Sequence, residues 1–161
     1  MPDETTDTIL EGVDLAKLSR WMDEQGLPEG VIAGAQLLAG GSQNILIRFE
    51  RGDRSYVLRR PPPHKRANSD ETMRREARVL RALAGSDVPH PGFIAGCDET
   101  EPLGACFYLM EPIEGFNPST GLPPLHAESD EIRHEMGLNM AGAIAALGEL
   151  DPFAVGLEGF G

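Results

Sequence analysis

Long apolar runs are absent from the 161 residues of this chain. No stretch approaches the ~20 apolar residues that a membrane-crossing helix needs. The acidic beginning, Met1 to Asp7, lacks the basic residues of a secretion signal. The two cysteines, Cys97 and Cys106, are too few for a disulfide framework and do not have metal-ligand spacing. We therefore expect a cytoplasmic protein with no membrane partner and no metal ligands in this chain.

Positive charge is also scarce, because 14 basic residues stand against 26 acidic ones and the net charge is −12. This balance argues against a nucleic-acid partner. Eleven of the basic residues and five of the acidic ones lie between Arg48 and Arg81, so this segment carries +6 and the remainder −18. A positive region in an acidic protein favours a phosphorylated small molecule as ligand. The alternative is a solvated basic helix face, which would explain the arginines of 74–81 but not the earlier ones.

The hydrophobic periodicity predicts an α+β domain. A helix is expected over about 13–26, followed by three strands, a second helix, two more strands, a linker and a last helix. The expected strands are 34–39, 45–50, 55–60, 92–96 and 105–111, and the later helices run from Asn68 to about Ala84 and from near Ser129 to 148. Runs of strands with a single helix between them predict an antiparallel sheet of about five strands.

A glycine pair separates the first two of these strands, in the stretch Leu38-Ala39-Gly40-Gly41-Ser42-Gln43-Asn44. Glycines there allow a close backbone approach to a ligand. Successive N–H groups in such a turn can form a nest for phosphate oxygens. The alternative is a hairpin that merely needs flexible residues at its tip.

A cation at the end of a strand and a carboxylate in the following helix come after the glycine pair. Arg59 ends the third expected strand, and Glu76 lies 17 residues later in the next helix. A turn that covers phosphates, a strand cation that neutralises them and a helix carboxylate that holds the cation are the nucleotide-binding parts of a kinase-type site.

Five sequence blocks strengthen this interpretation: the glycine stretch, Tyr56-Val57-Leu58-Arg59-Arg60-Pro61, Glu76-Ala77-Arg78-Val79-Leu80-Arg81-Ala82-Leu83, Val88-Pro89-His90-Pro91 and Phe107-Tyr108-Leu109-Met110-Glu111-Pro112-Ile113-Glu114-Gly115. In this order they resemble the aminoglycoside phosphotransferase/choline kinase-like family, and within it the branch that also occurs fused to acyl-CoA dehydrogenase domains. The resemblance implies a protein-kinase-like N-terminal lobe over 1–109, a hinge and linker over 110–128, and the start of a second lobe over 129–161.

The resemblance also implies roles for individual residues. Gly40, Gly41, Ser42, Gln43 and Asn44 would cover the phosphates of ATP. Arg59 stands where kinases usually have a lysine, and Glu76 would be its partner. Met110, Glu111 and Ile113 would belong to the hinge, where backbone groups bind the adenine. The implied reaction moves the γ-phosphate of ATP, with Mg²⁺, to the hydroxyl of a small substrate, which the branch suggests is acyl-CoA-like. The basic stretch Arg59-Arg60 to His64-Lys65-Arg66 would suit such a phosphate-rich ligand.

Two features depart from the family pattern. The glycine turn lacks a full G-x-G-x-x-G, and an arginine replaces the lysine. A third feature is an absence: the catalytic His-Gly-Asp loop and the later metal-binding aspartate do not occur in these 161 residues. We expect the catalytic aspartate and the Mg²⁺ ligands downstream of residue 161, so that this chain alone binds nucleotide weakly and transfers nothing. The alternative function is a non-catalytic, kinase-like binding or regulatory module. Exposed apolar surface on the helix 129–148 predicts a possible homodimer.

Overall fold

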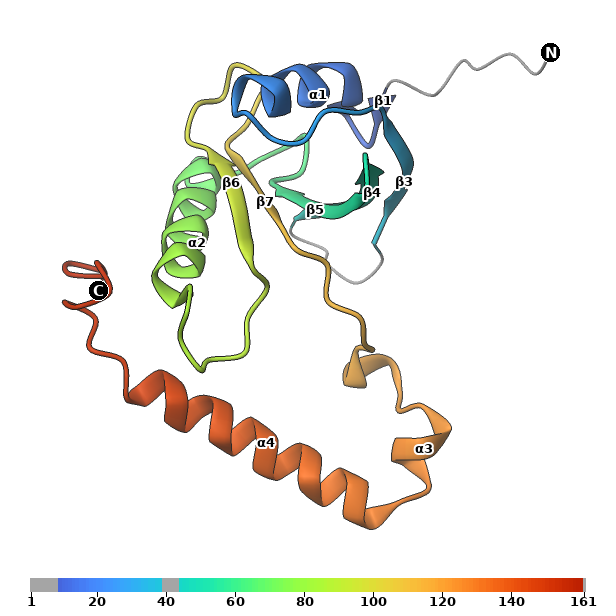
Figure 1. Cartoon of the computed structure of the whole chain (residues 1–161), viewed down its shortest axis with the longest axis vertical. Coiled ribbons are helices and arrows are strands. Elements are labelled where there is room, and N and C mark those ends of the chain that lie inside the picture. Colours follow the sequence, from blue (N-terminus) through green and yellow to red (C-terminus); the bar gives the residue numbers. More distant parts are fainter. Residues whose placement is uncertain (1–8, 39–43, 161) are drawn as a thin grey trace. The chain divides into compact units, whose positions relative to one another are not determined.

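The computed structural model describes residues 9–38 and 44–160, and its longer helices and strands follow the expected order, with the short β1, β2, η1 and α3 in addition (Figure 1). The elements are β1 (Ile9–Leu10), β2 (Val13–Asp14), α1 (Leu15–Glu24), β3 (Ile32–Leu37), β4 (Ile45–Arg51), β5 (Arg54–Arg60), α2 (Ser69–Leu83), β6 (Phe93–Cys97), β7 (Phe107–Met110), the 3-10 turn η1 (Pro118–Thr120), α3 (Pro124–Ala127) and α4 (Asp130–Gly148). None of the helices among these residues is long and apolar enough to cross a membrane.

Five strands form one antiparallel sheet in the order β3-β4-β5-β7-β6, which confirms the predicted α+β class. Strands β4 and β5 pair continuously from Ile45–Arg60 to Arg51–Arg54. Gly52, with φ of 61°, begins the two-residue turn between them. Such left-handed backbone conformations favour glycine, which explains why glycine occupies this turn.

Several predicted boundaries were wrong by one or two residues; the first long strand, for example, is Ile32–Leu37 and not 34–39. At two other boundaries a side chain satisfies a backbone N–H group. The first helix begins at Leu15 and not at 13, since the Asp14 carboxylate caps it by accepting a hydrogen bond from Lys17 N (3.0 Å). The last strand begins at Phe107 and not at 105. The N–H group of Cys106 donates to Asp70 Oδ1 (2.9 Å) in place of a strand partner.

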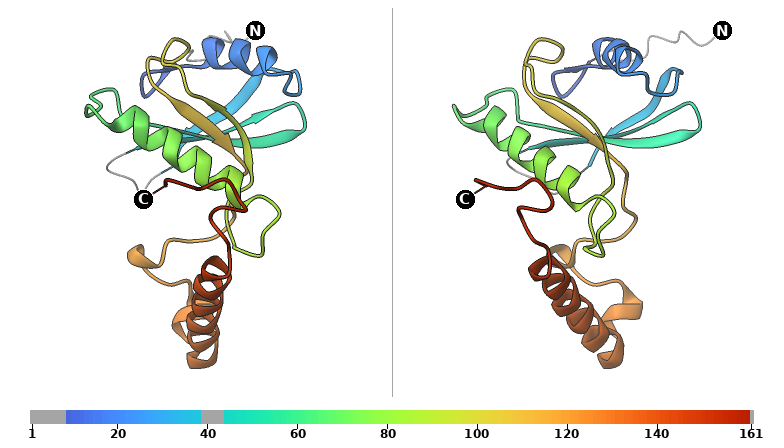
Figure 2. Two further views of the ribbon diagram at one scale, coloured as in Figure 1. Left: turned by 90° about the vertical axis from the view of Figure 1, so that its left-hand side faces the viewer. Right: turned by 60° about the vertical axis from the view of Figure 1, so that its left-hand side comes forward.

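The hydrophobic core lies between α1 and one face of the sheet. Alternate residues of β4, Ile45, Ile47 and Phe49, are buried on this face. Trp21 of α1 packs edge-to-face on Phe107 of β7, with ring centroids 4.7 Å apart. Helix α2 starts on the opposite face, and Figure 2 shows the two helices on either side of the sheet. The face toward α2 is the one that positions the candidate site.

Arg51, at the end of β4, fastens α1 to the sheet from within the core. Its side chain is 1% exposed. Its Nε donates to Gly30 O (2.9 Å), and its Nη2 contacts Asp23 of α1 and Ser19 Oγ. A buried guanidinium needs such partners because an unpaired buried charge is costly. This basic residue is therefore structural.

Internal contacts divide the chain into two units, residues 1–77 with 92–112 and residues 78–91 with 113–161. In the second unit Ser129 Oγ caps α4 at Ile132 N (3.3 Å), and Arg133 donates to His126 O (2.9 Å). Arg78 donates to Gly156 O (2.7 Å). The division predicted from the sequence, at 109 and 128, stays a prediction.

Candidate functional site

The centre of the candidate site is a forked ion pair between β5 and α2. Arg59 Nε lies 2.7 Å from Glu76 Oε2, and Arg59 Nη2 lies 3.2 Å from Glu76 Oε1. The two side chains are 26% and 31% exposed, so the pair is partly shielded from water and still reachable by a ligand. Two parallel N–H···O bonds fix the plane of the guanidinium as well as its position.

Tyr108 completes this pair. Its hydroxyl donates to Glu76 Oε2 at 3.0 Å. The strand register explains the meeting, because Arg59 and Tyr108 are directly paired between β5 and β7 and therefore point to the same face of the sheet. Glu76 reaches them from α2, in the part of that helix that belongs to the first unit.

The pKa values of Arg59 and Tyr108 are both shifted by burial and by the neighbouring Glu76. Burial lowers the pKa of Arg59, but the hydrogen bond to Glu76, the interaction with Tyr108 and the charge of Glu76 together outweigh it and leave the pKa above its ordinary value. Burial first, and then the negative charge of Glu76, raise the pKa of Tyr108 well above its usual range. The tyrosine therefore stays protonated as a donor, and the guanidinium stays cationic, at any working pH.

Sequence reasoning missed Tyr108 as a site residue. The sequence block Phe107 to Gly115 contains this tyrosine, but its pattern assigns a role only to the hinge residues that follow. The signal that could have found it is the register of β7 against β5, which depends on which strands are neighbours. That order is not visible in a single sequence.

The predicted hinge begins at the end of β7. Met110 is half-buried and pairs with Val57 and Phe93. The N–H group of Glu111 donates to Gly92 O (2.8 Å), so this residue can offer a ligand its carbonyl but not its amide. A Cβ on Gly92 would lie 2.4 Å from Glu111 Oε2, so the glycine allows this close approach. Ile113 belongs to the second unit and is exposed.

The predicted phosphate loop lies largely outside the described residues. Gly40, Gly41, Ser42 and Gln43 fall there, and Asn44 is the first described residue after them. The strands on both sides are joined up to this point, since Leu38 N donates to Leu46 O (2.8 Å). The roles predicted for these five residues stay predictions.

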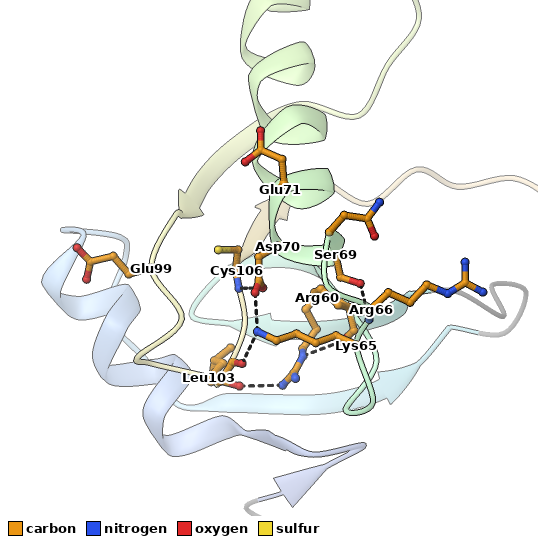
Figure 3. Close-up of polar contacts among 12 residues, drawn as sticks. Arg60, Lys65, Arg66, Ser69, Asp70, Glu71, Glu99, Leu103 and Cys106 are labelled. Carbon is orange, nitrogen blue, oxygen red and sulfur yellow. Dashed lines mark hydrogen bonds and ion pairs between the residues drawn. The ribbon is translucent and has the colours of Figure 1, made fainter.

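The basic stretch predicted to bind a phosphate-rich ligand divides into two sets (Figure 3). Arg60 is buried and donates to Leu103 O (3.0 Å). Lys65 Nζ lies 2.5 Å from Asp70 Oδ2 and 3.1 Å from Gly104 O. Both cations are thus bound by the protein itself. His64 and Arg66 instead line a polar cavity of about 300 Å³ beside the start of α2.

No group of three or more His, Cys, Asp or Glu side chains able to hold a metal ion occurs among the residues that the structure describes. Both cysteines there are free and buried. Burial raises the pKa of each thiol, which makes a nucleophilic role unfavourable.

The antiparallel sheet with a helix carboxylate paired to a strand cation defines a protein-kinase-like fold. Comparison with known proteins agrees. The sequence model of the phosphotransferase enzyme family matches residues 34–161, and the chain therefore belongs to this family. The crystal structure of a protein from Ralstonia eutropha JMP134, described as of the aminoglycoside phosphotransferase type, has a TM-score of 0.69 and 29% sequence identity. The match covers 92% of this chain and 42% of that one.

Two longer proteins show the branch within the family. The chain is 36% identical over 126 residues to the Arabidopsis thaliana acyl-CoA dehydrogenase IBR3, which covers 75% of this chain and 15% of that protein. It is 31% identical over 137 residues to acyl-CoA dehydrogenase family member 11 of Homo sapiens, covering 83% and 17%. These names confirm the resemblance to the branch associated with acyl-CoA dehydrogenases. The chain thus spans about one sixth of the length of these relatives.

Proposed function

We propose that this chain is the nucleotide-binding part of an ATP-dependent phosphotransferase that moves the γ-phosphate of ATP to a hydroxyl group of a small molecule. The observation that carries the proposal is the forked Arg59–Glu76 pair, held by Tyr108 on the α2 face of the sheet. A purely structural surface pair would not require two parallel bonds and a third buried donor.

Arg59 would neutralise phosphate oxygens of the nucleotide. A guanidinium can hold a carboxylate on one edge and phosphate oxygens on another, which suits it to the position where kinases usually have lysine. Glu76 would keep the fork in one orientation, and Tyr108 would keep Glu76 in place. Holding charge in a fixed arrangement before the ligand arrives is the main contribution a protein makes to phosphoryl transfer.

The remaining ligand contacts are proposed from the sequence and the backbone. The loop Gly40–Asn44 would cover the phosphates through its N–H groups. The carbonyl of Glu111 would accept from the adenine amino group, because its own N–H is already bonded to Gly92 O. Pro112 has no N–H to offer, so the next donor along the chain is Ile113, which would bind a ring nitrogen.

The acceptor we propose is a hydroxyl-bearing acyl-CoA or a similar compound, since the relatives are named as acyl-CoA dehydrogenases. Mg²⁺, when bound with ATP, would neutralise charge on its phosphates. We propose that the Mg²⁺ ligands and the residue that accepts the hydroxyl proton lie outside the described residues, and we assign no catalytic residue within the chain.

Titration calorimetry of ATP into the 161-residue chain tests the nucleotide site. Replacing Arg59 by Gln should weaken ATP binding roughly tenfold or more, because a charge-assisted contact is worth about 1.5–3 kcal/mol. Arg59→Lys should retain most of the affinity, since the charge remains. The matched control is Arg20→Gln, which removes an exposed arginine from α1. Equal affinities for the wild-type, Arg59→Gln and Glu76→Gln chains would refute the proposal.

Transfer itself is measured in the complete product of the gene, as release of ADP that depends on a hydroxyacyl-CoA. ATP binding without transfer to any hydroxyl compound would favour the alternative, a non-catalytic binding or regulatory module.

A further inference from the structure

The cavity beside the start of α2 is separate from the Arg59–Glu76 pair in its lining residues. Its volume is about 300 Å³, and its lining is mainly polar. Seven of the described residues line it: Asn44, Pro62, His64, Arg66, Asn68, Ser69 and Thr72. They come from three places in the first unit, namely the strand end after the glycine turn, the loop between β5 and α2, and the first turn of α2.

The charge of this cavity is opposite to that of the chain. The chain carries 26 acidic residues and a net charge of −12, yet no carboxylate is among the described residues that line the cavity. Arg66 supplies a full positive charge, and the N-terminus of the 15-residue helix α2 adds a partial one. The acidic residues of that first turn, Asp70 and Glu71, are held elsewhere.

Figure 3 shows how they are held. Asp70 turns toward β7, where it accepts from Cys106 N (2.9 Å) and pairs with Lys65. Glu71 points away along the helix, with Arg74 Nη1 at 3.4 Å from its Oε2. Arg66 extends away from the Lys65–Asp70 pair, and its guanidinium makes no hydrogen bond or ion pair with the residues that the structure describes. Asp70 and Glu71 are thus paired with other cations. The guanidinium of Arg66 is therefore available to bind an anionic ligand.

We propose that this cavity binds the phosphate group of a phosphate ester. Arg66 supplies the charge, and the side chains of His64 and Asn68 supply polar contacts around it. Thr72 Oγ1 donates to Asn68 O (3.0 Å) and only lines the cavity. The identification of this ligand as a substrate of the transfer rests on the proposed function. Its phosphate comes either from the chain of the nucleotide or from a phosphorylated acceptor such as one carrying a 4′-phosphopantetheine arm. Anion binding by the cavity itself does not depend on that assignment.

Calorimetric titration of the 161-residue chain with inorganic pyrophosphate at low ionic strength tests the site. We expect Arg66→Gln to weaken binding roughly tenfold, since one charge-assisted contact is lost. His64→Asn should weaken it less. Arg20→Gln, which removes the same charge from α1, should change it less than twofold. Both cavity residues are exposed, so the variants should fold like the wild type.

Two further titrants distinguish the sources of the phosphate. If Arg66→Gln weakens 4′-phosphopantetheine binding and not ATP binding, the cavity holds the acceptor. If it weakens ATP binding, the cavity holds the phosphate chain of the nucleotide. Both outcomes support a phosphate site. A wild-type chain that binds no pyrophosphate, or an Arg66→Gln chain that binds all three titrants as the wild type does, overturns the proposed phosphate site.

If Arg59→Gln leaves ATP binding unchanged while Arg66→Gln weakens pyrophosphate binding, the nucleotide assignment fails and the cavity remains an anion site.

Discussion

Two buried tyrosine hydroxyls, one hydrogen-bonded and one not, allow the contribution of a single hydrogen bond in the site to be measured. Tyr108 Oη donates to Glu76, whereas Tyr56 Oη is buried and has no partner among the described residues. Removing a satisfied donor loses a hydrogen bond to a charged group, and removing an unsatisfied one loses nothing. We expect Tyr108→Phe to lower the free energy of unfolding by about 1–2 kcal/mol.

The control for this measurement is Tyr56→Phe, which should leave the stability unchanged or slightly increased. Urea unfolding followed by the fluorescence of Trp21, the single tryptophan, measures both variants. Equal losses in the two variants would mean that the Tyr108 hydroxyl, bonded to Glu76, contributes no more to stability than the unpaired hydroxyl of Tyr56.

Single residues also show how far the sequence predicts the site. The pair Arg59–Glu76 was predicted because both residues fall at family positions, and the structure brings them together. Whether that pair binds nucleotide is a separate prediction that geometry does not test. Arg60 and Lys65 were grouped with the ligand-binding cations, but both donate to carbonyls of the loop before β7. A sequence shows that a residue is a cation and does not show which carbonyl will lie beside it.

At the scale of elements, the start of α2 is fastened to the sheet by one carboxylate. Asp70 accepts from Lys65 Nζ and from Cys106 N, and its side chain is 20% exposed. Burial alone would raise the pKa of Asp70, but these hydrogen bonds and the nearby charges of Lys65 and Arg74 hold it below its ordinary value. The folded chain therefore binds the proton more weakly than the unfolded chain does.

The contribution of Asp70 to the free energy of unfolding depends on pH. The stabilisation by Asp70 is fully present above the unfolded pKa of about 3.9 and is lost as the pH falls through the lower, folded pKa. At pH 7 we expect Asp70→Asn to cost about 1–2 kcal/mol of unfolding free energy. The difference from the wild type should shrink below about pH 4. Urea titrations across this range measure it, with the exposed Glu71→Gln as control, and a difference independent of pH would contradict the assignment.

Elements as a whole were predicted better than their ends. The expected bounds of β4, β5 and α2 agree with the structure to within one residue at each end. The pairing order β5-β7-β6 was not predictable in detail, because it depends on contacts between distant segments. The short β1 and β2, two residues each, carry too little pattern to be recognised.

At the scale of the whole molecule, charge is used in two ways. Of the cations between Arg48 and Arg81 that give this segment its charge of +6, Arg51, Arg60 and Lys65 are bound inside the first unit. Their charge still contributes to the field that attracts anions, because a field does not require a free side chain. Direct ligand contacts would come from a smaller set, in which we propose Arg66 because it lines the cavity beside α2. Net charge thus predicts the class of partner but not the residues that touch it.

Helix α4 carries several exposed apolar side chains, and none of its residues is buried. Met140, Ile144 and Leu147 follow one another at helical spacing, and each is more than half exposed. A soluble helix normally buries such a stripe, and exposed apolar patches promote association.

We expect the 161-residue chain to form dimers or larger species whose mass rises with concentration in light scattering. Replacing Ile144 by Lys should shift it toward the monomer. Val31→Lys adds the same charge at an exposed apolar residue of the first unit and should not. A wild-type chain that stays monomeric at every concentration would show that the stripe of α4 does not drive association.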